Sequence, residues 1–257
     1  MAQTTAEPRI AFLVGGAQKA GTSALAQYLR ASPGLRLPVE KEAHVFDAAD
    51  FDDAWSPAEI DARHADRFPD EVPGTRLGDA TPFYLFHPRC VARIARYNPA
   101  MRWIVLLRDP VERARSQHHM ERERGHERLP LWLAMLLERR RLRGQADDLA
   151  RGSRLRRCSY RARGDYARQL DTLYAHFPRE QVLLLRSERL RSDPEACVRD
   201  ACSFLGVPPP AAGSAYEPVF VGDYRPASPG SPGTRLLRWL MRRELREMRE
   251  RYGIVFD

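Results

Sequence analysis

Lysine is nearly absent from this sequence. The 257 residues include 42 basic side chains, of which only Lys19 and Lys41 are lysines and the rest are arginines. Arginine does not readily replace lysine where a compact, titratable ammonium group is needed. Genomic composition explains the arginine excess better than function does, but both lysines lie in loops that carry other functional signals. We therefore treat these two loops as candidate site segments.

Paired cysteines, a secretory leader and long apolar runs are also missing. The four cysteines are scattered, with no CxxC pair and no spacing typical of a zinc site. Residues 1–9 lack the basic segment of a signal peptide, and no apolar run is long enough for a transmembrane helix. These absences predict free thiols, no metal site, no membrane partner and a cytoplasmic protein.

The remaining composition is that of a globular chain. Hydrophobic residues make up 43% and charged residues 30%, which is enough for a sizeable core. Alternating strand and helix patterns predict a single α/β domain over residues 1–257, with a central, mostly parallel sheet flanked by helices. We expect residues 1–8 to be flexible and residues 208–233, rich in Pro and Gly, to form an irregular loop. The net charge of +8 favours anionic ligands.

The strongest local signal is at residues 12–25, FLVGGAQKAGTSAL. An apolar run leads into a glycine-bracketed turn and then into a helical pattern, which predicts a strand, a tight loop and a helix N-terminus. Unpaired N–H groups at such a helix start bind anions, and glycine lets the backbone approach the ligand. We predict a phosphate-binding loop. A tight connection without a ligand is the alternative.

This loop is P-loop-like but departs from the Walker A pattern. Gly16 and Gly21 have the expected four-residue gap, but Thr22 stands where the motif has its lysine, and Lys19 lies inside the gap. A nucleotide phosphate remains a plausible ligand for such a loop. The sequence does not support the Mg-nucleotide geometry of an ordinary NTPase.

The second lysine belongs to residues 40–47, EKEAHVFD. In an extended segment, Glu42 and His44 would project to the same side. A charge-rich, solvated loop is the alternative interpretation. For His44, a structural role in holding the Glu42 loop competes with a contact to the substrate.

Two further strand ends carry polar residues. Residues 75–82 predict a short strand ending in a polar turn with Thr81, and residues 101–107 predict a buried strand ending at Arg108. Pro110 then opens a helix that carries Ser116. Open α/β sheets bind ligands at the carboxyl ends of their strands, so we expect Arg108 and Ser116 to converge on one phosphate. A Walker B aspartate at Asp109 is the alternative.

The remaining elements follow from periodicity, caps and breakers. Helices are predicted at residues 23–31, 57–68, 131–142, 166–177, 194–205 and 236–252, with another buried strand at 182–185. The arginine-rich residues 151–163 contain Tyr160 and stop at Gly164, which predicts an ordered flap over a ligand. A solvated surface or a nucleic-acid patch is the alternative.

Together these segments resemble the PAPS-dependent sulfotransferases (PAPS is 3′-phosphoadenosine 5′-phosphosulfate). The most similar branch contains the heparan sulfate N- and 3-O-sulfotransferases and their bacterial relatives. Residues 18–25 resemble the family's 5′-phosphosulfate loop, and residues 41–47 its Lys-Glu-x-His-Phe-Phe-Asp segment. Residues 107–116 resemble its 3′-phosphate motif, and residues 164–207 resemble its C-terminal half.

The resemblance implies a role for each matching residue. Glu42 would be the catalytic base, with His44 beside it, and Lys19 would contact the bridging and sulfuryl oxygens of PAPS. The other implied cofactor contacts are Ala20, Gly21, Thr22, Ser23, Ala24, Arg108, Ser116, Tyr160 and Arg225. The implied acceptor-side residues are Lys41, His44, Asp47 and Thr81. Val45 departs from the family phenylalanine, and residues 224–235 replace a cysteine-bridged loop, which weakens the match at Arg225.

The implied function is metal-free, in-line transfer of a sulfuryl group from PAPS to a hydroxyl of a sugar or small natural product. An amine acceptor is a weaker option. Two alternatives belong to other classes. A P-loop kinase or NTPase would need Mg-ATP, and the displaced lysine and Arg108 argue against it. An arginine-rich nucleic-acid-binding protein is disfavoured by interleaved acidic residues and by the lack of a recognisable nucleic-acid module.

Overall fold

The structure is a computed structural model that describes residues 9–68, 73–211, 213–217 and 230–256. The candidate contact Arg225 and the N-terminal residues 1–8 lie outside the described residues, as does much of the predicted loop at 208–233.

Five parallel strands form the centre of the molecule, in the order β2-β3-β1-β4-β5. The strands are β1 (Ile10–Gly16), β2 (Leu35–Arg36), β3 (Arg76–Asp79), β4 (Arg102–Leu107) and β5 (Val182–Arg186). Because β1 lies between β3 and β4, the chain crosses first to one side of β1 and then to the other. The carboxyl ends of these three strands therefore border the topological switch point, where open sheets bind ligands. The predicted parallel α/β fold is confirmed.

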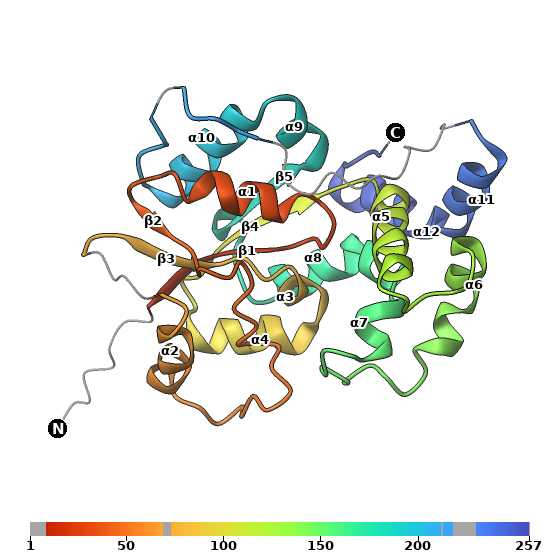
Figure 1. The fold of residues 1–257 in the computed structure, drawn as a ribbon, viewed down its shortest axis with the longest axis horizontal. Coiled ribbons are helices and arrows are strands. Elements are labelled where there is room, and N and C mark those ends of the chain that lie inside the picture. The colour runs from red at the N-terminus through yellow and green to blue at the C-terminus, as the bar shows by residue number, and fades with distance from the viewer. Residues whose placement is uncertain (1–8, 69–72, 212, 218–229, 257) are drawn as a thin grey trace.

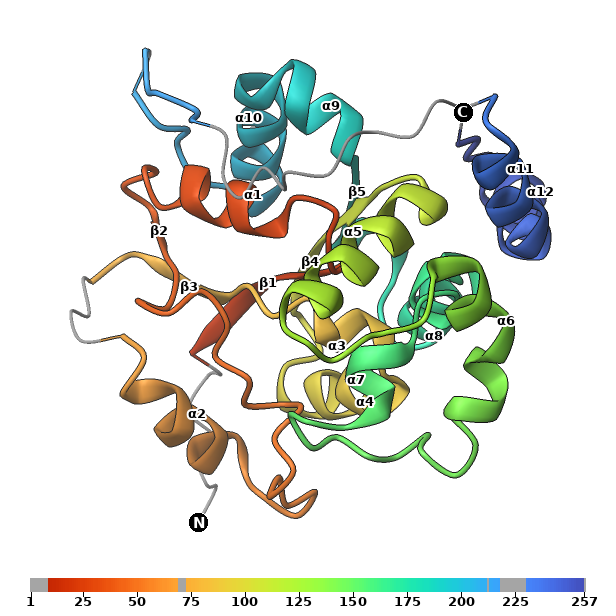
Figure 2. The same cartoon turned by 45° about the vertical axis from the view of Figure 1, so that its right-hand side comes forward.

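Helices cover both faces of the sheet. Figure 1 shows α1, α9 and α10 on one face and α3, α4 and α8 on the other, and Figure 2 shows the same layers after a turn of 45°. The helices of the N-terminal half are α1 (Thr22–Leu29), α2 (Pro57–Ala65), α3 (Phe83–Phe86), α4 (Pro88–Tyr97), α5 (Pro110–Glu123) and α6 (Leu131–Arg141). The later ones are α7 (Arg154–Cys158), α8 (Tyr166–Tyr174), α9 (Ser187–Ser192), α10 (Pro194–Leu205), α11 (Pro232–Leu240) and α12 (Arg242–Tyr252).

Local sequence explains where several helices begin and end. Ser56 and Glu59 form a reciprocal capping box at α2, as their spacing predicts. The Asp109 carboxylate accepts hydrogen bonds from the N–H groups of Val111 and Glu112 at the start of α5. Gly206 ends α10 in the left-handed conformation. One or two residues close in the sequence fix each of these ends, which is why the sequence predicts them well.

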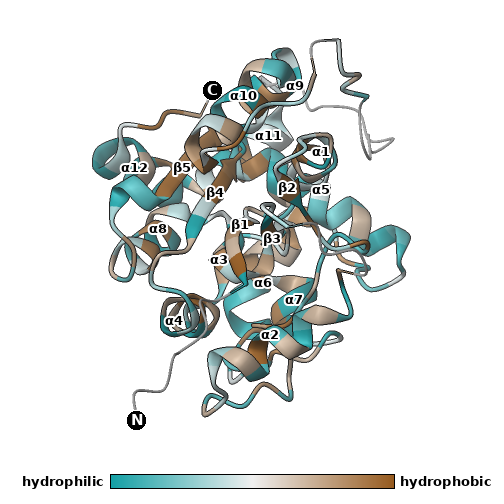
Figure 3. Cartoon of the chain, turned by 90° about the vertical axis from the view of Figure 1, so that its left-hand side faces the viewer, coloured by the Kyte–Doolittle hydropathy of each residue, from teal (hydrophilic) through white to brown (hydrophobic). Residues whose placement is uncertain are grey.

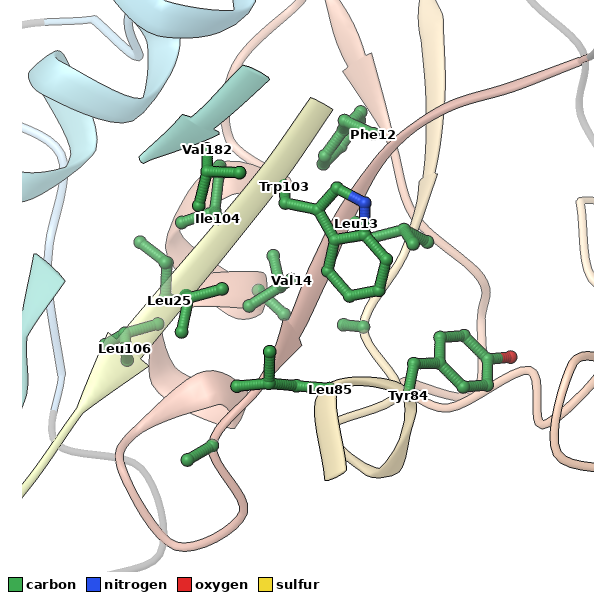
Figure 4. Close-up of a cluster of buried hydrophobic side chains, with 14 of the residues drawn as sticks. Phe12, Leu13, Val14, Leu25, Tyr84, Leu85, Trp103, Ile104, Leu106 and Val182 are labelled. Carbon is green, nitrogen blue, oxygen red and sulfur yellow. The ribbon is translucent and has the colours of Figure 1, made fainter. Parts of the chain in front are cut away.

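The main core lies between the sheet and its two helical layers. Figure 4 shows Trp103 and Val14 of the central strands packed with Leu25 of α1 and Leu85 of α3. The Trp103 side chain is fully buried. Figure 3 shows hydrophobic residues concentrated on β4 and β5 and hydrophilic ones along α12. Burial of this apolar surface is the main favourable contribution to folding.

A second, smaller hydrophobic cluster lies where the predicted C-terminal helix divides into two. The single helix predicted at 236–252 is wrong: the chain forms α11 and α12, separated at Met241. Met241 is fully buried and packs with Leu237 and Leu240 against α5 and α6. Helix α11 begins at Pro232 behind the Ser231 cap, so the irregular loop ends earlier than predicted. Tertiary packing, which periodicity does not report, sets this break.

Other boundaries differ by a few residues. Helix α1 runs from Thr22 to Leu29 rather than over the predicted residues 23–31, and the strand β2, Leu35–Arg36, was not predicted. Helices α2, α6 and α8 end one to three residues before their predicted limits. Helices α3, α4 and α9 were not predicted, and part of the predicted flap is helical as α7.

Close packing of β3 against β1 generates a stability prediction. A Cβ atom added at Gly78 would lie 2.3 Å from Cζ of the fully buried Phe12. Gly78→Ala should therefore destabilise the protein by about 1–3 kcal/mol, because a buried ring must move. Urea unfolding measures the effect. Gly233→Ala in α11, where nothing lies within 4 Å of the added atom, is the matched control. Equal unfolding midpoints for the two variants would contradict this account.

Candidate active site

The predicted site segments meet at the carboxyl ends of three neighbouring strands. The β1–α1 loop follows β1, Thr81 follows β3 and Arg108 follows β4. The N–H of Ala17 donates to the carbonyl of Leu106 over 2.7 Å, and Nη1 of Arg108 donates to the carbonyl of Lys19 over 3.1 Å. These bonds hold the β1–α1 loop, which we call the phosphate-type loop, against the end of β4. An anion bound there would contact both the loop and Arg108.

The start of α1 is suited to an anion. Gly21 is the N-cap with φ of 101°, a left-handed conformation that favours glycine. No described side chain caps this helix, and its first turn has no acidic residue. By contrast, side chains cap α2, α5 and α10. The first N–H groups of α1 and its dipole are therefore available to a negatively charged ligand.

Lys19 stands in the same loop, with φ of 69°. Burial, together with the positive charges of Arg124 and Arg108, lowers the pKa of its ammonium group. A site that disfavours its own positive charges gains from a bound anion, which relieves their mutual repulsion. The loop therefore has both the backbone donors and the charge to hold a phosphate.

The Lys41 ammonium joins this loop to the second candidate segment. It donates to Oγ1 of Thr22 over 3.2 Å and to Oε1 of Glu42 over 2.9 Å. Thr22 is the first residue of α1, so one side chain connects the helix start to the predicted base. Glu42 thus lies within one bridging residue of the candidate anion site.

A chain of charged contacts continues beyond Glu42. Nε2 of His44 lies 3.1 Å from Oε2 of Glu42, and its Nδ1 lies 2.9 Å from Oδ2 of Asp47. Nη2 of Arg156 donates to the same Asp47 oxygen over 2.7 Å, and its guanidinium stacks 3.9 Å over the ring of Phe83. Glu42, His44 and Asp47 therefore each contact two charged side chains.

The segment is not extended, contrary to the expectation on which Glu42 and His44 would share a side. His44 has φ of 55°, in the left-handed region that is uncommon for a residue with a side chain. The two side chains nevertheless face each other through their hydrogen bond. The turn, and not strand alternation, brings them together.

The contacts set the charge states of Glu42 and His44. Burial raises the pKa of Glu42, but the hydrogen bond from His44 and the charge of Lys41 outweigh it and bring the pKa to about 2. Burial lowers the pKa of His44, but its bonds to Asp47 and Glu42 raise it to about 9. Near neutral pH, Glu42 is therefore a carboxylate and His44 an imidazolium.

The two residues predicted for the second phosphate belong to one β4–α5 unit. Arg108 is mostly buried and lies 3.9 Å from the Glu112 carboxylate, one turn into α5. Ser116 is buried on the same helix. Their shared unit is consistent with the predicted contact of both residues to one phosphate, which stays a prediction.

Several predicted ligand residues have internal partners instead. Tyr160 is fully buried, and its hydroxyl donates to Glu127 over 2.9 Å, so its predicted contact with the cofactor stays a prediction without support from the structure. The Asp47 side chain is likewise buried between His44 and Arg156. Thr81 is fully buried and donates to Asp79 over 2.8 Å. Asp47 and Thr81 therefore contact neighbouring residues of the site in the structure, and their contact with an acceptor stays a prediction.

Arg156, which lies within the arginine-rich run 151–163, is a site residue that was not predicted. Thirteen consecutive residues with several arginines give no local signal that one of them reaches Asp47. Its contact depends on α7 packing near Phe83, which only the fold provides.

The described residues contain neither a candidate metal site nor a candidate membrane span. Among residues 9–68, 73–211, 213–217 and 230–256, no group of three or more His, Cys, Asp or Glu side chains is arranged to hold a metal ion. Within the same residues, no helix is both long and apolar enough to cross a membrane.

Comparison with known proteins gives one consistent family. The model of the family described as "Sulfotransferase domain" matches residues 9–215. Mouse heparan sulfate glucosamine 3-O-sulfotransferase 3B1 is 30% identical over 196 residues, which cover 76% of this chain and 45% of the mouse protein. Mouse bifunctional heparan sulfate N-deacetylase/N-sulfotransferase 4 is 29% identical over 77% of this chain and 22% of its own. The chain spans less than half the length of these curated relatives.

A solved structure supports the same family at the level of the fold. The sulfotransferase from Alicyclobacillus acidocaldarius is similar with a TM-score of 0.71 and 28% identity, covering 94% of this chain and 95% of that one. The residues that match the family include the phosphate-type loop, residues 40–47 with Glu42, and β4. The chain therefore belongs to the sulfotransferase domain family.

Proposed function

We propose that this enzyme moves a sulfuryl group from PAPS to a hydroxyl of a sugar or small natural product, with Glu42 as the general base. The Lys41 bridge is the observation that carries the proposal, because it joins the anion-ready start of α1 to the Glu42 carboxylate. In-line transfer needs the base close to the phosphate-bound group, and proximity of this kind contributes much of the rate.

The residues fit an adenosine bisphosphate group. The N–H groups of Gly21 to Ala24, at the start of α1, and the ammonium of Lys19 would hold the 5′-phosphate. The N–H of Ala20, the other predicted contact, donates to the carbonyl of Ala17 over 3.1 Å. Arg108 and Ser116 would hold the 3′-phosphate. When bound, PAPS supplies an activated sulfuryl group, with a phosphate oxygen as the leaving group. Lys19 would stabilise the negative charge that develops there.

Glu42 would accept the acceptor hydroxyl's proton on a carboxylate oxygen as that hydroxyl attacks. A carboxylate with a pKa near 2 is a weak base, because both of its oxygens already accept hydrogen bonds. Each carboxylate oxygen keeps a second lone pair that can take the proton, and Glu42 becomes a stronger base if one donor leaves. We assign this to Lys41, since an anion at the start of α1 would attract its ammonium away from Oε1. His44 would keep Glu42 oriented meanwhile.

The acceptor side would include Lys41 and His44, whose side chains are 21% and 22% exposed. A carbohydrate hydroxyl is consistent with the 3-O-sulfotransferases among the relatives. We expect no nucleic-acid or membrane partner. We also expect a cytoplasmic location, where the free thiols of Cys90, Cys158, Cys197 and Cys202 would stay reduced.

The cofactor is tested by thermal shift. With EDTA present, 3′,5′-adenosine bisphosphate at a hundredfold excess over its Kd should stabilise the enzyme by about 2.7 kcal/mol. Lys19→Met should weaken that binding about tenfold, the loss of one charged hydrogen bond. Arg139→Met, which removes an exposed charge from α6, is the control. Stabilisation only by Mg-ATP would instead identify a kinase or NTPase.

The base is tested by Glu42→Gln. The amide keeps the side-chain shape but cannot accept a proton, so turnover should fall by about 10²–10⁴-fold. The Kd for 3′,5′-adenosine bisphosphate, from isothermal titration calorimetry, should stay unchanged. Glu40→Gln removes an exposed carboxylate paired with Arg67 and should leave turnover intact. Product masses from candidate acceptors incubated with PAPS report transfer. Loss of nucleotide binding in Glu42→Gln would reassign Glu42 to the cofactor site.

The Glu42–His44 pair generates a pH prediction. The folded-state pKa of His44 is raised from 6.5 to about 9, so its stabilising effect is complete below pH 6.5 and disappears as pH rises through 9. The free energy of unfolding lost in His44→Gln should therefore be larger at about pH 5.5 than at about pH 9.5. Urea unfolding at both values measures the difference. An equal loss at both would contradict the assigned imidazolium.

A further inference from the structure

Asp79 is a fully buried carboxylate at the carboxyl end of β3, beside the loop that carries Glu42. Its Oδ1 accepts a hydrogen bond from the N–H of Ala43 over 3.2 Å and one from the Thr81 hydroxyl over 2.8 Å. Its Oδ2 accepts a hydrogen bond from the Tyr84 hydroxyl over 2.7 Å. A buried carboxylate is costly unless such donors satisfy it.

The two hydroxyl groups pass this anchoring on to the next residues of the loop. The hydroxyl of Thr81 accepts the N–H of His44 over 3.3 Å, and that of Tyr84 accepts the N–H of Val45 over 3.0 Å. Each hydroxyl accepts on the loop side and donates on the Asp79 side, as a hydroxyl can. Three successive backbone N–H groups, at residues 43 to 45, therefore all point toward one carboxylate, directly or through one hydroxyl.

The bonds span the strained part of the loop. His44 has φ of 55°, and a left-handed residue with a side chain persists when its surroundings hold it in place. Bonds at Ala43, His44 and Val45 fix the backbone on both sides of that angle. The same angle directs the His44 ring between Glu42 and Asp47.

We propose that Asp79 is a positioning residue for the catalytic base, with the hydroxyls of Thr81 and Tyr84 as relays that hold the Glu42 loop in its working geometry. This inference rests on the proposed role of Glu42. It assigns Thr81 to the loop rather than to the acceptor. Tyr84 packs at the edge of the core with its hydroxyl directed away from Leu85, as Figure 4 shows, so the core in turn fixes the relay.

The chain contains a matched control for the Tyr84 relay. The hydroxyl of Tyr97 accepts the N–H of Ile10 over 2.9 Å and donates to Asp61. Both tyrosines are buried, and both rings lie 5.4 Å from that of Phe46. Tyr97, however, serves the first residue of β1, at the opposite end of the strand from the site. Tyr84→Phe and Tyr97→Phe thus remove the same chemistry at two places.

The experiment compares these variants by kcat, by nucleotide affinity and by NMR titration of His44. Tyr84→Phe should lower kcat at least about tenfold, because even a small displacement of the base strongly slows the reaction. Its Kd for 3′,5′-adenosine bisphosphate should change less than twofold. The pKa of His44 should fall from about 9 toward 6.5 as its contacts with Glu42 and Asp47 loosen. Tyr97→Phe should lose stability but keep all three values.

Further variants test Asp79 directly, and a conservative substitution at Thr81 separates the loss of a hydroxyl from misfolding. Asp79→Asn places an NH₂ group against an incoming donor and should reproduce the effects of Tyr84→Phe. Thr81→Val removes the other relay at similar volume and should do the same, whereas Thr81→Ser keeps the hydroxyl and should restore kcat.

The outcomes separate this proposal from the proposed function. If Tyr84→Phe and Thr81→Val match Tyr97→Phe in kcat and in the His44 titration, the positioning role is wrong. If the wild-type enzyme transfers no sulfuryl group to any acceptor, the proposed function fails. The His44 titration would still decide whether Asp79 holds the loop.

Discussion

The site depends on one ammonium group shared by two loops. Lys41 donates both to Thr22, at the start of α1, and to Glu42, in a loop that follows β2. The two loops belong to different crossovers and meet because parallel strands end at one edge of the sheet. A single cation then sets the separation between the anion site and the carboxylate. Most of the other contacts in the site orient one or the other end of this bridge.

Much of the fold could be predicted because its signals are local. The apolar run before Arg108 indicates a buried strand, and Asp109 with Pro110 marks the start of α5. The glycines around Lys19 indicate a tight turn into a helix, which the structure confirms, with Gly21 in a left-handed conformation. Given these elements, the topology of a parallel sheet brings their loops together. The convergence of Lys19, Glu42 and Arg108 therefore needed little beyond element order.

What could not be predicted depends on contacts between distant segments. Arg156 is one arginine in a run of them, and its bond to Asp47 exists only because α7 packs beside α3. Tyr160 lies within the same run, but its hydroxyl donates inward to Glu127. The break between α11 and α12 follows from the burial of Met241. The left-handed turn at His44 also has no signature in the sequence, since glycine or asparagine would be the usual residue there.

The scarcity of lysine has a practical consequence for chemical labelling. Because Lys19 and Lys41 are the only lysines in the sequence, reagents selective for primary amines have two side chains to react with, apart from the terminal amine. Both side chains lie at the candidate site, and the lowered pKa of Lys19 leaves more of its amine unprotonated and nucleophilic. Isotopic methyl groups placed by reductive methylation would therefore report on the two ends of the site. Random amine coupling to a solid support would instead modify that site.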